Sequence, residues 1–176
     1  MQRDLLVIGG GPAGTAAAIT AARAGANVTL FEKGEHGRDK VCGDGLTPRA
    51  IAALDRLSID HSVAHRIDGL RMIAGKKSRE LAWPDTDRFP SHGALWPRNR
   101  FDTHLMDVAA ASGAEICFGT EALPVVEDGR VVGVEAEGRI HRADMVVLAA
   151  GAQGAAAKIL GAERDPREPF GLAIRA

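Results

Sequence analysis

Apolar runs and glycine breaks organise the first thirty residues of the chain. Residues 5–8 are apolar without alternation, as expected of a parallel strand that is covered on both faces. The glycine-rich stretch 9–14 follows, and then an alanine-rich segment of helix-forming composition. A second apolar run, 28–31, ends at the acidic residue Glu32. The pattern therefore predicts a strand, a glycine turn, a helix and a second strand that leads into a carboxylate.

Helical and alternating periods then succeed one another along the chain. Thr47 and Pro48 predict an N-cap and a first helical residue, and Ile51, Leu54 and Leu57 give that helix an apolar face. The further elements expected, in chain order, are a β-hairpin with strands at 70–73 and 79–83, a helix from 98 to near 113, strands at 115–118, 122–126, 131–135 and 140–142, and a buried strand at 145–148 that runs into a glycine turn.

The glycine turn has the spacing of a dinucleotide-binding fingerprint. Gly9 permits a tight turn, Gly11 lets the backbone approach a pyrophosphate, and Gly14 lets the helix lie close to the strand. The N-terminus of the helix offers unpaired N–H groups and a partial positive charge to phosphates. We expect Ala18 and Gly25 to extend the close contact between helix and sheet, because that contact needs small side chains at intervals.

Glu32 follows the second strand, where a dinucleotide-binding unit places its acidic residue. We expect its carboxylate to accept a hydrogen bond from a ribose hydroxyl. The same charge repels a 2′-phosphate, so the ligand predicted here is FAD or NAD and not NADP.

Composition narrows the class of protein. The 176 residues are enough for one domain that buries roughly 70% of its unfolded surface. The net charge is −1, with basic and acidic residues mixed, so we expect no nucleic-acid partner and no polybasic membrane patch. Cys42 and Cys117 form no metal or disulfide pattern, which favours a reducing cytoplasm and no metal site. The uncharged stretch 5–22 contains glycines and a proline that argue against a membrane span or signal peptide.

Several motifs together carry a resemblance to a known family. They are 9–14, Glu32 with Lys33, 40–50, Arg100 at the head of its helix, and 149–151 after the last strand. On these residues the chain resembles the geranylgeranyl reductase family of FAD-dependent oxidoreductases, relatives of the para-hydroxybenzoate hydroxylase-like flavoproteins. Residues 38–45 look most like the branch that reduces one isoprene double bond of the menaquinone tail.

The resemblance implies FAD as the cofactor and a set of residues that bind it. These are Gly9, Gly11, Pro12, Ala13 and Gly14 at the pyrophosphate, Glu32 at the ribose with Lys33 beside it, Gly43, Asp44 and Gly45 near the flavin ring, Arg100 on the phosphate side, and Gly151 after the last strand. Cys42 is the candidate catalytic residue, with a buried packing role as its alternative. The alternatives for Asp44 and Arg100 are a plain turn residue and a surface arginine at a helix start.

The implied reaction is the reduction of a carbon–carbon double bond in an isoprenoid chain, either a menaquinone tail or a geranylgeranyl group. An isolated alkene is a poor electrophile, so the site needs a proton donor and a dry, apolar pocket. The implied partners are an isoprenoid lipid or quinone as substrate and a reduced nicotinamide or another electron donor. We expect a cytoplasmic protein, and a lipid substrate is compatible with peripheral association at the inner face of the membrane.

The predicted fold class is α/β, a Rossmann-like FAD-binding domain interrupted by part of a β-rich substrate domain. The FAD-binding domain is expected to combine a parallel sheet and helices with a small antiparallel β-meander. We assign 1–63 and 97–165 to it, 64–96 to the insertion, and 166–176 to the start of a truncated substrate-domain strand. Because the family continues well beyond this length, we expect the chain to be an N-terminal portion that is inactive alone.

Two departures from the family pattern keep other functions open. Ala150 stands where the family has an aspartate, and Gly154 where it has a serine. One alternative is an FAD-dependent aromatic hydroxylase (a monooxygenase) on the same fold. The other is a non-catalytic or degenerate nucleotide-binding module.

Overall fold

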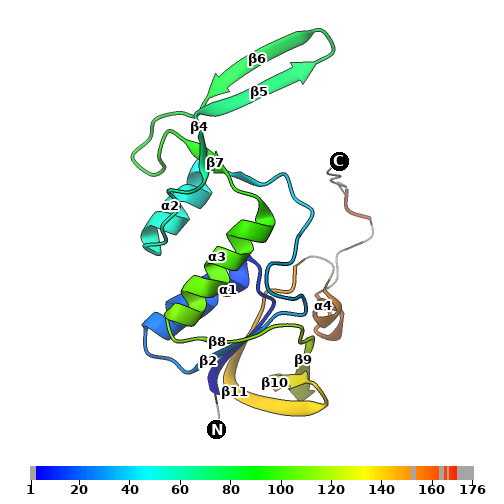
Figure 1. Cartoon of the computed structure of the whole chain (residues 1–176). Coiled ribbons are helices and arrows are strands. Elements are labelled where there is room, and N and C mark those ends of the chain that lie inside the picture. Colours follow the sequence, from blue (N-terminus) through cyan, green and yellow to red (C-terminus); the bar gives the residue numbers. More distant parts are fainter. Residues whose placement is uncertain (1–2, 152–153, 163–164, 166, 170–176) are drawn as a thin grey trace. The chain divides into compact units, whose positions relative to one another are not determined.

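The computed structural model describes residues 3–151, 154–162, 165 and 167–169 and contains a six-stranded sheet (Figure 1). In spatial order the strands are β8 (Glu115–Cys117), β2 (Val28–Phe31), β1 (Arg3–Ile8), β11 (Arg139–Leu148), β10 (Arg130–Ala136) and β9 (Ala122–Glu127). The first four are parallel, and β10 and β9 continue the sheet as an antiparallel meander. The predicted α/β class is confirmed, while the strand expected near 170–175 lies outside the described residues.

Strand β1 is buried on both faces, as its uninterrupted apolar run predicts. It pairs with β2 on one side and β11 on the other, and residues 5–8 are all buried. Val7 lies next to helix α1 (Pro12–Arg23), since a β-carbon on Gly14 would be 3.2 Å from its Cγ1. Leu6 and Ile8 point the other way, into a hydrophobic cluster.

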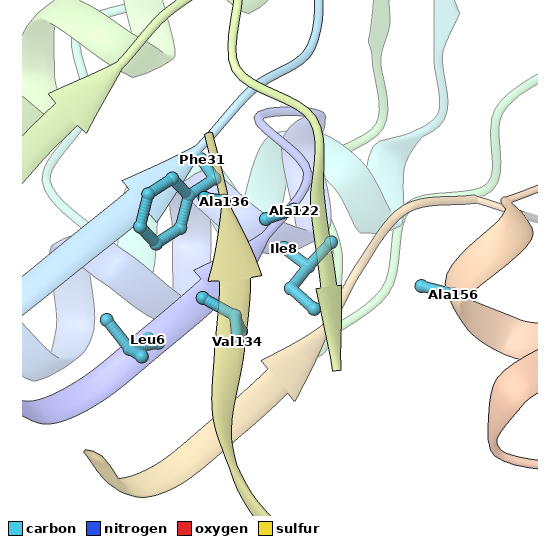
Figure 2. Close-up of a cluster of buried hydrophobic side chains, with 7 residues drawn as sticks. All are labelled: Leu6, Ile8, Phe31, Ala122, Val134, Ala136 and Ala156. Atoms are coloured by element: carbon cyan, nitrogen blue, oxygen red, sulfur yellow. The ribbon is translucent and has the colours of Figure 1, made fainter. Parts of the chain in front are cut away.

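That cluster ties the parallel strands to the meander and to the short helix α4 (Ala155–Ile159). Figure 2 shows its buried members, which are Leu6, Ile8, Phe31, Ala122, Val134, Ala136 and Ala156. Several are alanines, so the elements approach one another closely. The cluster holds the carboxyl end of β1, and hence the glycine turn that follows, in a fixed position.

The last strand differs from its prediction. Two strands were expected, at 140–142 and 145–148, but β11 is one continuous strand of ten residues. Its first part pairs with β10 and its second part with β1, so the change in sequence pattern marks a change of partner and not a break. The second part is also less buried than predicted, with Met145 63% exposed.

Helix α1 ends at Arg23, and Gly25 does not extend its contact with the sheet. Ala18 is fully buried against the sheet as expected. Gly25 instead has φ +90° with open space around it, and its N–H bonds the carbonyl of Ala22 while that of Ala26 bonds Ala21. Gly25 is therefore a left-handed helix stop, and its predicted packing role is wrong.

The described residues divide into two compact units, one from 3–39 together with the described part of 102–169, and the other from 40–101. The second unit contains helix α2 (Pro48–Arg56), the sheet β3 (Gly45–Leu46), β7 (Gly93–Leu95) and β4 (His65–Ile67), and the hairpin β5 (Gly69–Ala74) with β6 (Lys77–Ala82). The hairpin and α2 are confirmed, and Thr47 caps α2 by accepting the N–H of Ala50 at 3.3 Å. This unit is wider than the predicted insertion, and the domain boundaries drawn from the sequence stay a prediction.

Helix α3 (Arg98–Ala111) begins in the second unit and continues into the first. Within the described part of the chain, no helix has the length and apolar character needed to cross a membrane.

Candidate functional site

Two glycines of the first turn are required by the chain's own packing. Gly9 has φ +104°, and a β-carbon there would lie 2.6 Å from the carbonyl oxygen of Ala149. A β-carbon on Gly14 would lie 1.9 Å from the carbonyl oxygen of Gly9. The turn therefore packs between helix α1 and the end of β11, with backbone in direct contact on both sides.

Gly11 differs, because no other described part of the chain comes close to the position of a β-carbon on it. It is the N-cap of α1 with an extended backbone (φ −76°), and no described atom beyond its chain neighbours lies within 4 Å of where its β-carbon would be. Among the described residues no side chain caps this helix end, and its first turn carries no acidic residue. Its N–H groups and the positive end of its dipole suit an anion, so these residues fit a pyrophosphate. Pro12 is the first helical residue, and Ala13 beside it is exposed.

Glu32 lies directly beside this turn. The residue is buried (4% exposed), and its Oε2 accepts the N–H of Gly10 at 2.8 Å. Oε1 accepts the N–H of Gly34, also at 2.8 Å. Arg38 donates from Nε to Oε1 (2.8 Å) and from Nη2 to Oε2 (3.1 Å). The carboxylate thus bridges the glycine turn and the loop that follows β2.

Burial alone would raise the pKa of Glu32, but the hydrogen-bond donors around its carboxylate lower this pKa by more. The hydrogen bonds from Arg38, Gly34 and Gly10 hold the pKa below its ordinary value. Glu32 is therefore an anion at neutral pH although it is buried.

Arg38 and Asp102 are the members of this site that sequence reasoning did not assign. Arg38 Nη1 lies 3.3 Å from Oδ2 of Asp102, whose side chain is buried on α3. A signal for Asp102 was present, because it shares the apolar face of its helix with Leu105 and Ala109. A charged residue at a core position needs a partner of opposite charge. No comparable signal singled out Arg38, which lies in an irregular loop.

The end of β11 reaches the same edge of the sheet. Ala149 donates its N–H to the carbonyl of Ile8 at 2.8 Å, and Gly151 follows with φ +78°. Ala150 and Gly154, the two departures from the family pattern, lie together. A β-carbon on Gly154 would be 2.7 Å from that of Ala150. Each small residue therefore makes room for the other.

Residues 42–45 belong to the second unit, and the structure gives Asp44 a definite role there. Its Oδ1 accepts the N–H of Arg98, the first residue of α3, at 3.1 Å, and its carbonyl accepts the N–H of Trp96 at 2.9 Å. It has φ +56°, which Asp tolerates better than most residues. Asp44 thus caps a helix that starts far along the chain.

The other predicted site residues lie at or near the surface. Cys42 is half-buried, and both Gly43 and Gly45 are exposed, with a β-carbon on Gly45 placed 3.8 Å from the carbonyl oxygen of Gly43. Arg100 and Lys33 are exposed. The structure therefore brings together the glycine turn, Glu32 and the 149–151 segment, and the cofactor roles of all these residues stay predictions.

Comparison with known proteins agrees with a nucleotide-binding turn of this kind. Residues 2–172 match the protein family described as FAD binding domain. The chain belongs to this family. This match confirms the FAD-binding domain predicted from the sequence and FAD as its cofactor.

Relatives of this FAD-binding domain include two groups of reductases. Menaquinone reductase of Mycolicibacterium smegmatis is 38% identical over 181 residues, covering 99% of this chain and 44% of that protein. Digeranylgeranylglycerophospholipid reductase of Picrophilus torridus is 32% identical over 154 residues, covering 84% of this chain and 39% of that protein. The resemblance to the geranylgeranyl reductase family is confirmed.

A solved structure has the same fold. The crystal structure of a geranylgeranyl bacteriochlorophyll reductase-like protein from Thermoplasma acidophilum superimposes with a TM-score of 0.71 at 32% identity, covering 86% of this chain and 40% of that one. This FAD-binding domain therefore spans less than half the length of the relatives it matches.

Proposed function

We propose that this chain is the FAD-binding portion of an oxidoreductase that reduces a carbon–carbon double bond of an isoprenoid chain. The substrate is an isoprenoid lipid or quinone, with a menaquinone tail or a geranylgeranyl group as its reacting part. Electrons come from a reduced nicotinamide or another donor. A cytoplasmic location with peripheral contact to the membrane suits such a substrate.

One observation carries the cofactor part of this proposal. Gly11 is open, it begins a helix without a side-chain cap, and the buried Glu32 carboxylate lies beside that helix end. The first feature admits a pyrophosphate to the backbone, and the second offers it N–H donors. The third supplies a hydrogen-bond acceptor for a ribose hydroxyl and repels a 2′-phosphate. FAD has this ribose hydroxyl and no 2′-phosphate.

The ribose would meet a carboxylate that already has four donors. Two of them are the backbone N–H groups of Gly10 and Gly34, which are fixed by the fold. The other two belong to the Arg38 side chain. An ionised carboxylate offers about four acceptor positions, so a ribose hydroxyl would share or replace an Arg38 donor.

The reaction class is supported by the names of the relatives. Those relatives are reductases of menaquinone and of digeranylgeranylglycerophospholipid. Bound FAD would supply the hydride chemistry that an alkene requires. The residues of this chain would hold the adenosine half of that cofactor. Gly43 is exposed, with no described atom beyond its chain neighbours within 4 Å of where a β-carbon would be, which suits the approach of a flat ring.

Flavin uptake tests the cofactor part. The purified chain is mixed with FAD, freed of excess ligand and examined for bound flavin in its visible spectrum, with FAD identified after denaturation. We expect retained FAD and no retained NADP. A chain that takes up no FAD would favour the degenerate module.

Product mass tests the reaction class. The full-length oxidoreductase of which we propose this chain to be the FAD-binding portion is loaded with FAD, reduced chemically without oxygen, and incubated with a menaquinone of short isoprenoid tail. Reduction of one double bond adds two hydrogens to the tail. An oxygen-dependent product carrying one added oxygen atom on an aromatic ring would instead establish the hydroxylase alternative.

A further inference from the structure

Arg38 reaches Glu32 with the two-point geometry that fixes a carboxylate in orientation as well as in charge. Its Nε and Nη2 contact different oxygens, at 2.8 and 3.1 Å. The planar guanidinium therefore lies along the carboxylate edge and restrains its rotation. A lysine at this position would supply the charge without that restraint.

The loop after β2 is shaped to accept this arginine. A β-carbon on Gly34 would lie 2.3 Å from Cδ of Arg38 and 3.1 Å from Cγ. The stem of the arginine therefore lies directly over a glycine, whose N–H also binds Glu32. The Arg38 backbone N–H bonds the carbonyl of Glu35 at 3.1 Å, which closes the turn that aims the side chain. This contact is built into the loop and is not a chance surface ion pair.

Asp102 holds the far side of the same guanidinium. Its carboxylate is fully buried, and Oδ2 lies 3.3 Å from Arg38 Nη1. Arg38 is thus placed between two buried carboxylates, one directly after β2 and the other on α3, which are far apart in sequence. Loss of one member of such a buried set is costly, because it leaves another charge uncompensated.

We propose that Arg38 is a positioning residue of the nucleotide site, which orients the Glu32 carboxylate toward the ribose while Asp102 holds Arg38 in place. This inference rests on the proposed nucleotide function only for what Glu32 binds. The contacts of Arg38 with Glu32 and Asp102, which we call the clamp, are present in the nucleotide-free chain. The pKa of Glu32, which burial alone would raise, is lowered by these contacts, in agreement with the clamp.

The direct test measures Glu32 without any nucleotide. The side-chain carboxyl ¹³C resonance of Glu32 is titrated in the chain as it is, in Arg38→Gln and in Arg38→Lys. We expect the Glu32 pKa to rise by about one to three units in Arg38→Gln and by less in Arg38→Lys. An unchanged pKa in both variants would overturn the proposal. If Arg38→Gln does not fold, Arg38→Lys decides by the same criterion.

ADP affinity as a function of pH then tests the link to the nucleotide. The terminal phosphate of ADP itself titrates near neutrality, so the quantity compared is the ratio of the variant's ADP dissociation constant to that of the unchanged chain at each pH. We expect this ratio to grow for Arg38→Gln as pH falls from about 8 to about 5, because Glu32 takes up its proton earlier in the variant, and to grow less for Arg38→Lys. A raised Glu32 pKa with a ratio that does not change with pH would overturn the positioning role. Failure of the unchanged chain to bind ADP or FAD at all would count against the proposed function, while the titration still judges the clamp.

Discussion

Gly14 and Gly9 are in backbone contact across the first turn, so closely that a β-carbon on Gly14 would lie 1.9 Å from the carbonyl oxygen of Gly9. Replacement of Gly14 by alanine must therefore move helix α1 away from the sheet. We expect Gly14→Ala to lower the free energy of unfolding by about 3 kcal/mol or more. Denaturant unfolding of this variant measures the loss. The matched control is Gly11→Ala, which meets no atom within 4 Å and should change stability by no more than about 1 kcal/mol. Equal losses in the two variants would contradict the assigned packing.

Asp44 should contribute to stability in two separable ways. It caps α3 through the N–H of Arg98, and it holds φ at +56°. We expect Asp44→Asn to be nearly neutral and Asp44→Gly to cost about 1 kcal/mol through the lost cap. Asp44→Ala should cost about 1–3 kcal/mol, because it loses the cap and strains the backbone. Unfolding free energies that rank alanine above glycine would refute this assignment.

The charge of Glu32 predicts the pH dependence of stability. Its pKa is lowered in the folded chain, so the unfolded chain binds the proton more readily. The stabilisation by ionised Glu32 is therefore complete above the unfolded pKa of about 4.3 and is lost as pH falls through the lower folded value. The gap in unfolding free energy between the unchanged chain and Glu32→Gln, measured over a pH series, should be constant near neutrality and shrink in acid. A difference in unfolding free energy that grows in acid would show that folding raises the pKa of Glu32 and does not lower it.

Ala150 and Gly154 should behave as a coupled pair. A side chain at 154 meets the β-carbon of Ala150 at 2.7 Å, so we expect Gly154→Ala to cost about 1–3 kcal/mol. The double variant Ala150→Gly with Gly154→Ala should recover part of this loss, giving a coupling of at least about 0.5 kcal/mol. The free energy of unfolding is measured by heat and by denaturant for the unchanged chain, the two single variants and the double variant, which together form a double-mutant cycle. Simple additivity would mean that the two positions are independent.

The parts of the fold that sequence could predict are those governed by local periodicity. A few consecutive residues are enough to predict the buried strand at 5–8, the cap at Thr47 and the hairpin of β5 and β6. Strand β11 was wrongly predicted as two strands. Its pairing changes from β10 to β1 along its length, and the resulting change in the pattern of polar and apolar residues resembles the end of a strand. Gly25 was misassigned because a small residue near a helix end fits both a packing contact and a left-handed stop.

The site shows the same limit. The spacing of Gly9, Gly11 and Gly14 indicates a phosphate turn, but only coordinates separate the two glycines needed for packing from the one left open. Arg38 meets Glu32, and Asp102 meets Arg38, through folding of a loop and a distant helix, which no local pattern encodes. Long-range ion pairs of this kind are set by tertiary structure.

The central claim is that a pyrophosphate approaches the backbone at Gly11 because no β-carbon stands there, and FAD uptake by Gly11→Val tests it most directly. The extended backbone of Gly11 tolerates valine and the surrounding space is open, so the fold should survive with an unfolding free energy within about 1 kcal/mol of the unchanged chain. We predict that this folded variant retains no flavin after removal of excess FAD, whereas the unchanged chain does. A folded Gly11→Val protein that binds FAD as tightly as the unchanged chain would contradict the account.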